Sequence, residues 1–191
     1  MHCPALDEQP FHVLAPIADR IDADARFAEK NRFDMPEDAI AGFSGAYRFL
    51  SNFWTSEIMM HDLPYPSVEH AYQAAKALDP AERPRIRFAG SPAIAKRLGR
   101  FVPMRPDWEK AKTAIMLALV RRKFSIPENA SQLLATGNRQ IFEVTTRWHD
   151  SVWGVVEKAG TFHGANRLGR ILENVRAELR AHHAPDNPAE A

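Results

Sequence analysis

Residues 67–76 read SVEHAYQAAK and directly follow a Tyr-Pro pair. Serine is a preferred N-cap, so the pattern predicts a helix that begins here and ends before Pro80. Glu69, Gln73 and Lys76 are spaced at i, i+4 and i+7, and therefore share one polar face of this helix beside an apolar stripe. That face could form the wall of an active site. The dipole of a helix also stabilises an acid in its first turn, without any catalytic role.

Four further segments have the boundaries or the periodicity of helices. Ser91 and Pro92 begin a helix that ends near residue 99, and Asp107 begins the longest one, which runs to about residue 124. Pro127 begins another, which ends near residue 137. The last helix has apolar residues at i, i+3, i+4, i+7 and i+11, a pattern that predicts a core-facing stripe of Leu168, Ile171, Leu172, Val175 and Leu179.

Strands are expected to be few and short. Residues 58–60 and 141–145 are predicted to be short strands, and residues 43–53 a strand or an irregular loop, because aromatic residues mix there with glycines. A short helix is expected within residues 19–33. The predicted fold class is therefore mainly α, a compact single-domain helical bundle with a few short β-strands.

The composition favours one globular domain with an extension at each end. The chain has 191 residues, of which 45% are hydrophobic and 26% are charged, an ordinary balance. Residues 1–40 are rich in proline and are expected to form an N-terminal extension packed loosely on the domain. Residues 41–181 are expected to form the domain itself, and the polar residues 182–191 a flexible tail.

Charge and hydropathy exclude several classes of protein. The formal net charge of +1 gives no electrostatic reason to expect strong binding to a nucleic-acid duplex, although a local cluster could still hold a small anion. The longest apolar run, residues 114–120, is far too short to span a bilayer, and the N-terminus lacks a signal pattern. The only cysteine is Cys3, so no disulfide can form within the chain. We expect a cytoplasmic protein without membrane contact, and the sequence does not predict its oligomeric state.

No sequence motif indicates a metal or a redox cofactor. The histidines lack the spacing of metal ligands, and there is no Walker loop, no Gly-x-Gly-x-x-Gly motif and no Gly-x-Ser-x-Gly motif. Cys3 is a poor candidate for a nucleophile because it lies near the chain end. The candidates for chemistry are therefore carboxylates, lysines and aromatic side chains, and no cofactor is expected.

Residues 148–154 read WHDSVWG and place Asp150 between Trp148 and Trp153. This window could be a loop whose rings are buried against the core. It could equally hold a planar ligand stacked on a ring, with Asp150 reaching the sugar of that ligand or an attacking water. Trp108, at the start of the longest helix, fits a core stripe on spacing alone.

Residues 164–167 read GANR at the start of the last helix. Glycine allows close approach of the backbone, and the free amides of a helix N-terminus favour an anion such as phosphate. Arg167 or Arg170 could supply a charged partner for it. The alternative is that Asn166 simply caps the helix.

In this order, the motifs resemble the NADAR family, named for NAD and ADP-ribose. The segments that carry the resemblance lie between about residues 43 and 180 and read FLSNF (49–53), YPSVEHAYQAAK (65–76), ALVRRKF (118–124), LLATG (133–137), DSVWG (150–154) and GANRLG (164–169), with Trp108 between the second and third. The resemblance implies a compact, mainly helical domain that hydrolyses an N-glycosidic bond between a ribose and an amine or base. Members of the family act on phosphorylated pyrimidine intermediates of riboflavin synthesis, and others remove ADP-ribose from guanine in nucleic acid.

The resemblance also implies roles for single residues. Glu69, Trp108, Asp150 and Trp153 match the catalytic pocket of the family, and Lys76 matches a family lysine that could attack the anomeric carbon or pair with Glu69. The positions that match contacts to the ligand are Asn52, Gly164 and Asn166. Beside these, Gly154 is a candidate contact to the substrate, and Arg167 is the candidate partner for phosphate at the helix start. Two departures bear on the substrate: VVEK at residues 155–158 replaces a family loop that is often richer in glycine or acid, and the N-terminal extension lies outside the shared region.

The working hypothesis is therefore an N-glycosidase in which two carboxylates divide the chemistry. Glu69 activates water or stabilises the cationic ribose, Asp150 orients the ribose or the water, and the tryptophans hold the leaving base. Its substrate is expected to be a small phosphorylated ribosylamine or an ADP-ribose-type nucleotide, with ADP-ribosylated nucleic acid as a further candidate. The alternatives are a module that binds NAD or ADP-ribose without catalysis and a helical interaction domain whose tryptophans are core.

Overall fold

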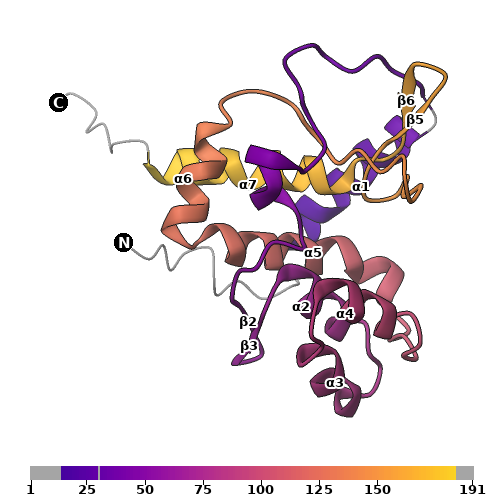
Figure 1. Cartoon of the computed structure of the whole chain (residues 1–191), viewed down its shortest axis with the longest axis vertical. Helices are drawn as coiled ribbons and strands as arrows, with labels where there is room; N and C mark the ends of the chain where they lie inside the picture. Colours follow the sequence, from indigo (N-terminus) through magenta and orange to yellow (C-terminus); the bar gives the residue numbers. More distant parts are fainter. Residues whose placement is uncertain (1–13, 30, 184–191) are drawn as a thin grey trace.

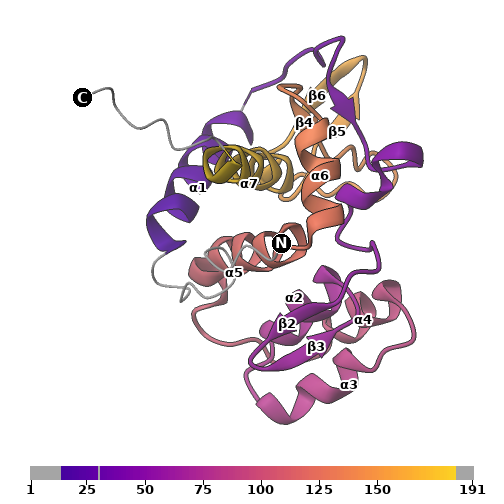
Figure 2. The same cartoon turned by 90° about the vertical axis from the view of Figure 1, so that its left-hand side faces the viewer.

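Helix α5 (Trp108–Phe124) forms the centre of the molecule and has other helices packed on several sides. Its residues from Thr113 to Arg121 are all buried, as expected of a helix enclosed on all sides. Helices α1 (Ala15–Glu29) and α7 (Arg167–His183) pack on one side of α5, whereas α2 (Val68–Ala75), α3 (Arg83–Arg87) and α4 (Pro92–Leu98) lie on the other (Figures 1 and 2). Helix α6 (Pro127–Ala135) joins α5 to this framework.

The computed structural model describes residues 14–29 and 31–183 of the chain. Helices dominate this range, so the predicted mainly α fold class is confirmed. Cys3 and the predicted tail beyond residue 183 lie outside it. Residues 182 and 183 belong to α7, so the last helix extends into the segment that we expected to be tail.

The helix starts predicted from capping residues are confirmed. The Ser67 hydroxyl accepts a hydrogen bond from the His70 amide at the start of α2, and the Ser91 hydroxyl accepts one from the Ile94 amide at the start of α4. The predicted stripe of α7 is fully buried and joins the core cluster. These helices are therefore anchored in the positions that the sequence pattern indicated.

The strands are short and occur in pairs. Strand β1 (Ile40–Ala41) runs parallel to β4 (Ile141–Phe142), with Ile40 opposite Ile141. Strand β2 (Ile58–Met60) forms an antiparallel hairpin with β3 (Leu63–Tyr65), and β5 (Val156–Lys158) forms another with β6 (Thr161–His163). The strand predicted at residues 141–145 is thus shorter than expected, because beyond Phe142 only a single bridge pairs Val144 with Val155.

Two short 3-10 helices also occur within residues 14–29 and 31–183. The first, η3 (Gly45–Leu50), occupies the segment for which we predicted a strand or an irregular loop, and the second, η4 (Pro80–Glu82), follows α2. Neither was predicted, nor was α3. Elements of three to six residues are too short to show a periodicity.

Helix α1 packs against α5 and α7, where we expected a loosely attached extension. It begins at Ala15, earlier than the predicted segment, with Pro16 in the first turn where proline is tolerated. Ala18, Ile21 and Ala25 are buried. On the outer side of this contact, Asp22 Oδ1 accepts hydrogen bonds from Thr113 Oγ1 at 2.9 Å and from Arg167 Nε at 2.7 Å. The helix therefore belongs to the same core as the rest of the described residues, in which no helix combines the length and apolar character that a bilayer span requires.

Candidate active site

A cavity of about 320 Å³ opens between α2, the first half of α5 and the loop after β4. We call it the catalytic cavity. Its wall carries the acids Glu69, Glu109, Glu143 and Asp150, the lysines Lys76, Lys96 and Lys112, and the aromatic residues Phe53, Tyr72, Trp108, Trp148 and Trp153. Cavities that combine apolar walls with a few converging polar groups are the usual place for ligand binding.

The polar face predicted for α2 lines this cavity as a chain of hydrogen bonds. Glu69 Oε1 accepts a hydrogen bond from Gln73 Nε2 at 2.8 Å, and Gln73 Oε1 accepts one from Lys76 Nζ at 3.3 Å. Lys76 Nζ also donates to the carbonyl of Gly99 at 3.2 Å. The amide of Gln73 thus connects an acid to an amine and fixes the orientation of both.

Burial acts on both ends of this chain. It raises the pKa of the Glu69 carboxyl, while Lys96, the hydrogen bond from Gln73 and Lys76 act in the opposite direction. Burial also lowers the pKa of Lys76, and the Glu69 carboxylate opposes that change. The two pKa values are therefore displaced towards each other, and perturbed pKa values cluster at functional sites.

Close packing of α4 against α2 requires the glycine that follows α4. A Cβ atom on Gly99 would overlap Oε1 of Gln73, although the backbone of Gly99 has an ordinary helical conformation with φ of −64°. Gly99 therefore serves close approach rather than an unusual dihedral angle. Its own carbonyl is the one that holds Lys76.

The loop after β4 brings Asp150 and Trp153 to the cavity together. Asp150 Oδ1 accepts hydrogen bonds from the backbone amides of Val152 at 3.0 Å and Trp153 at 2.9 Å, the pattern of an aspartate-initiated turn. The hydroxyl of Thr145 donates to the Asp150 carbonyl at 2.8 Å. One carboxylate thus both faces the cavity and sets the direction of the tryptophan ring.

Three aromatic rings form one wall of the catalytic cavity. The ring of Tyr72 lies 4.9 Å from that of Trp108 and 5.5 Å from that of Trp153, measured between centroids. Burial raises the pKa of Tyr72 well above its usual range, so its hydroxyl stays protonated. Trp108 is only 5% exposed and belongs to the core cluster as well as to the cavity wall, so its two interpretations from the sequence are compatible.

Asn52 lines the cavity and has an unpaired side-chain oxygen. Its Nδ2 donates to the sulfur of Met116 at 3.4 Å, and its backbone carbonyl accepts from the Glu69 amide at 3.1 Å. Within the described residues its buried Oδ1 has no hydrogen-bond partner. A buried polar atom without a partner is uncommon in folded proteins. A hydroxyl of a bound sugar could satisfy it.

Four of the residues expected to contact the ligand do not line this cavity. They are Gly154, Gly164, Asn166 and Arg167. These residues instead contact the backbone of the loop that carries Asp150 and of the segment before it. The side chain of Asn166 accepts from the Glu143 amide at 3.2 Å and donates to the Ile141 carbonyl at 2.8 Å. That of Arg167 is bound to Asp22 and donates to the Val152 carbonyl at 3.2 Å.

The two glycines of this group allow segments of backbone to pass close together. A Cβ on Gly154 would overlap the Glu143 carbonyl, and one on Gly164 would lie 2.6 Å from the carbonyl of Gly154. Gly164 also has φ of +135°, which side chains rarely tolerate. These contacts hold the loop against β4 and the start of α7.

Glu143 is the principal site residue that sequence reasoning missed. Burial raises the pKa of its carboxyl to about 8, Asp150 and Glu69 add to this rise, and Lys96 opposes it. Its position in the sequence does carry a signal, because an acid stands between Phe142 and Val144 in a predicted strand. Lys96 was also missed, and a lysine on a short amphipathic helix gives no comparable signal.

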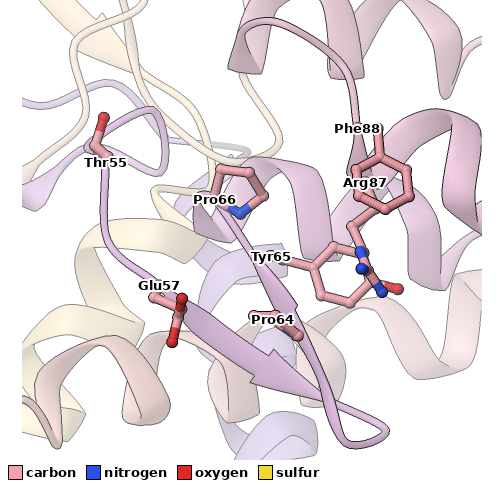
Figure 3. A pocket seen from close by; sticks show the side chains of 7 residues that line it. All are labelled: Thr55, Glu57, Pro64, Tyr65, Pro66, Arg87 and Phe88. Carbon is pink, nitrogen blue, oxygen red and sulfur yellow. The ribbon is translucent and has the colours of Figure 1, made fainter.

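A separate hollow of about 360 Å³ lies beside the β2–β3 hairpin (Figure 3). Its wall consists of Thr55, Glu57, Pro64, Tyr65, Pro66, Arg87 and Phe88, so it offers one acid and no tryptophan. The guanidinium of Arg87 lies over the Phe88 ring at 4.4 Å. Its lining lacks the converging carboxylates of the catalytic cavity. Elsewhere too, residues 14–29 and 31–183 bring together no three His, Cys, Asp or Glu side chains that could hold a metal ion.

Comparison with known proteins gives a consistent set of relatives. The model of the NADAR domain family matches residues 38–180. N-glycosidase YbiA of Shigella boydii is 36% identical over 149 residues, which cover 75% of this chain and 90% of that protein. A riboflavin biosynthesis protein of Vibrio vulnificus is 39% identical over 142 residues, or 73% of this chain and 37% of that protein. The NMR structure of the E. coli protein YbiA is similar with a TM-score of 0.67 and 30% identity, and covers 86% of this chain and 98% of its own.

Proposed function

The chain belongs to the NADAR domain family, and from that membership and the catalytic cavity we infer that it is an N-glycosidase acting in riboflavin-related chemistry. We propose that its substrate is a phosphorylated ribosyl-pyrimidine intermediate of riboflavin biosynthesis. The observation that carries the mechanism is the convergence of Glu69, Glu143 and Asp150 on one cavity beside an aromatic wall. Three acids in a wall that also buries tryptophan suit the cleavage of a bond between a sugar and a planar base.

Breaking an N-glycosidic bond develops positive charge on the ribose. The C1′–N bond breaks with its electron pair moving to nitrogen, so the leaving nitrogen needs a proton and the ribose needs a nearby negative charge. Water then bonds to C1′ and gives up a proton. An enzyme accelerates this reaction by holding groups that interact more strongly with the cationic transition state than with the substrate.

Glu69 is proposed to face the ribose. Its carboxylate would stabilise the developing cation or accept the proton of the attacking water. The hydrogen bond from Gln73 fixes one carboxylate oxygen, and the neighbouring lysines Lys76 and Lys96 oppose the rise in its pKa and so favour the charged form. Asp150 is held by the backbone amides of Val152 and Trp153 in the loop after β4, and from there it would orient the ribose or the water.

Glu143 is proposed to protonate the leaving nitrogen. With a pKa of about 8 its carboxyl carries a proton at neutral pH, which is the state that a general acid requires. Glu69 and Glu143 would thus divide the work as base and acid, in the way that paired carboxylates do in glycoside hydrolysis. The base leaves along the wall of Tyr72, Trp108 and Trp153, and the unpaired oxygen of Asn52 would accept a sugar hydroxyl.

Two roles are proposed for Lys76. Burial lowers its pKa, which is the direction that an amine attacking the anomeric carbon requires. Its hydrogen bonds to Gln73 and to the Gly99 carbonyl favour a role in holding Glu69 in place. Gly154, Gly164, Asn166 and Arg167 are proposed to act as positioning residues for the loop that carries Asp150 and Trp153.

The test is a screen for products by mass spectrometry. Purified protein would be incubated separately with the phosphorylated riboflavin pyrimidine intermediates, NAD, ADP-ribose and an oligonucleotide carrying ADP-ribosylated guanine. Release of ribose 5-phosphate with a free pyrimidine is the expected result. Release of ADP-ribose from the oligonucleotide would instead make the protein a nucleic-acid hydrolase, and tight binding of ADP-ribose without any product would make it a sensor.

A further inference from the structure

Another hollow, of about 700 Å³ and distinct from the one beside the β2–β3 hairpin, adjoins the catalytic cavity. We call it the outer cavity. It shares Lys96, Glu143 and Asp150 with the catalytic cavity, so the two spaces meet where the acids stand. Its other lining residues include Arg48 and Arg100, which the catalytic cavity lacks.

The lining of the outer cavity carries three cations, one of which, Lys96, also acts on the acids Glu69 and Glu143. Arg48 comes from η3, Lys96 from α4 and Arg100 from the turn just after α4, so distant parts of the sequence bring three cations to one space. Within the described residues none of the three forms an ion pair or a side-chain hydrogen bond to a carboxylate. By contrast, Arg121 and Arg167 are paired with Glu178 and Asp22. Because the whole chain has a formal net charge of only +1, this gathering of unpaired cations is a local feature.

An exposed tryptophan lies in the same wall. Trp148 is 56% exposed, whereas Trp108 is buried at 5% exposure. Trp148 lines both cavities and stands next to His149, which lies in the left-handed region with φ of 53°. The ring of Trp148 is therefore accessible to a ligand that occupies either cavity.

We propose that the outer cavity binds the phosphate monoester of the substrate through Arg48, Lys96 and Arg100, with the ribose under Trp148. Guanidinium groups bind phosphate with two parallel hydrogen bonds, and lysine adds a point charge. The ribose then spans the junction of the two cavities, with its anomeric carbon beside Glu143 and Asp150 and on the side of Glu69, and the base enters the catalytic cavity. This inference rests on the proposed function and adds to it the residues that hold the phosphate of the sugar.

The same observations explain why the helix start at residues 164–167 is a poorer phosphate site. The Asn166 side chain and the Arg167 guanidinium are already hydrogen-bonded within the fold, and neither lines a cavity. Binding an anion there would require these bonds to break. The three cations of the outer cavity need no such rearrangement.

The proposal is tested by binding of ribose 5-phosphate, with ribose as the probe that lacks the phosphate. Calorimetry would compare the wild type with the double variant Arg48→Ala/Arg100→Ala and a control, Arg85→Ala/Arg97→Ala. The control arginines are exposed, lie on α3 and α4, and line neither cavity. Circular dichroism would verify that each variant is folded.

The expected result is a 10- to 100-fold weaker binding of ribose 5-phosphate in the first variant, as the loss of two charge-assisted contacts predicts, and no change in the control. Inorganic phosphate should compete with ribose 5-phosphate in the wild type. Equal affinity of wild type and variant for ribose 5-phosphate would overturn the proposal. A loss confined to binding of the oligonucleotide would also overturn it, in favour of a nucleic-acid surface.

Because this measurement needs no turnover, it remains decisive if the screen finds no substrate. Failure of the proposed function would appear as absence of any cleaved product, with phosphate binding unaffected. Failure of the phosphate site would appear as turnover of the phosphorylated substrate with a KM that the double variant leaves unchanged.

Discussion

Glu69 and Glu143 reach the same cavity from a helix and from the end of a strand, and burial raises the pKa of both carboxyls. The lysines that oppose these rises in pKa are not the same for the two acids. Lys96 acts on both acids, whereas Lys76 acts on Glu69, to which it is linked through Gln73. The structure thereby gives two similar side chains different environments, which is how one pair of carboxylates can serve as base and acid.

The substitution Glu143→Gln should remove the proton donor. In the wild type, kcat/KM should stay level up to about pH 8 and fall above it, because Glu143 is protonated below its raised pKa and cannot donate above it. In the variant, kcat/KM should be about 10²- to 10⁴-fold lower and should no longer fall above pH 8. Steady-state kinetics between pH 6 and about pH 9.5 measure both effects.

Unfolding provides a control for this assignment that needs no substrate. The pKa of Glu143 is about 8 in the folded chain and 4.5 for an unburied glutamate, so the folded chain binds more protons than the unfolded chain between these pH values. The protonated form therefore contributes stability that is full below about pH 4.5 and is lost as pH rises through about 8. The free energy of unfolding of the wild type, relative to Glu143→Gln, should fall across that range. A constant difference would contradict the raised pKa.

Sequence reasoning located Glu69, Gln73 and Lys76 as one face because helical periodicity is a local property of the chain. It could not identify Glu143 as a candidate acid, because the pKa of that side chain depends on which distant residues bury it. Nor could it see that Asn166 and Arg167 are already bound, because their partners Ile141 and Asp22 lie far away in the sequence.

The packing of helix α4 on helix α2 determines how the side chains of the site are held. Helix α4 approaches α2 closely enough for the Gly99 carbonyl to bind Lys76. The capping serines at the start of both helices could be predicted from the sequence. The close packing of the two helices could not, because no local pattern specifies which helices pack together. The short helix η3 and the β5–β6 hairpin were not predicted for a related reason, since tertiary contacts stabilise such short elements more than local propensity does.

Replacing Gly99 by alanine should push α4 away from α2. The added Cβ overlaps the Gln73 amide, so the hydrogen bonds from Gln73 to Glu69 and from Lys76 to Gln73 should be disturbed. We expect a loss of about 1–3 kcal/mol in the free energy of unfolding and a clear decrease in kcat. Urea unfolding and steady-state kinetics are the measurements.

The matched control is Gly90→Ala, before the start of the same helix. A Cβ there would meet only Ile94 Cδ1, at 3.9 Å, which is an ordinary contact. This variant should keep both stability and kcat. If Gly99→Ala behaved like the control, the close approach of α4 would not be important for the arrangement of Glu69 and Lys76.

At the scale of the whole molecule, α1 supports the loop that carries Asp150 through hydrogen bonds that start at Asp22. Asp22 holds Arg167 and Thr113, and Arg167 in turn holds the Val152 carbonyl in the loop of Asp150. The mainly α fold class was predictable from the many periodic segments. The position of α1 was not, because its proline-bearing neighbourhood resembles an extension and its partner residues lie on α5 and α7.

The substitution Asp22→Ala should therefore destabilise the protein more than its place near the N-terminus suggests. It leaves the largely buried guanidinium of Arg167 without its carboxylate, and we expect a loss of about 2–4 kcal/mol in the free energy of unfolding. Asp24→Ala, on an exposed position of the same helix, should change it by less than about 0.5 kcal/mol. Equal effects in urea unfolding would show that α1 is only loosely attached.

The most direct test of the account compares Glu69→Gln with Glu109→Gln on the phosphorylated ribosyl-pyrimidine substrate. Glu109 lines the same cavity, but its side chain is 75% exposed and pairs with Lys112 at 2.5 Å. The account predicts that Glu69→Gln lowers kcat for cleavage of the C1′–N bond at least about 100-fold while binding of ribose 5-phosphate persists, and that Glu109→Gln stays within a few-fold of the wild type. Near-normal turnover by a folded Glu69→Gln variant would contradict the assignment of this cavity as the catalytic site.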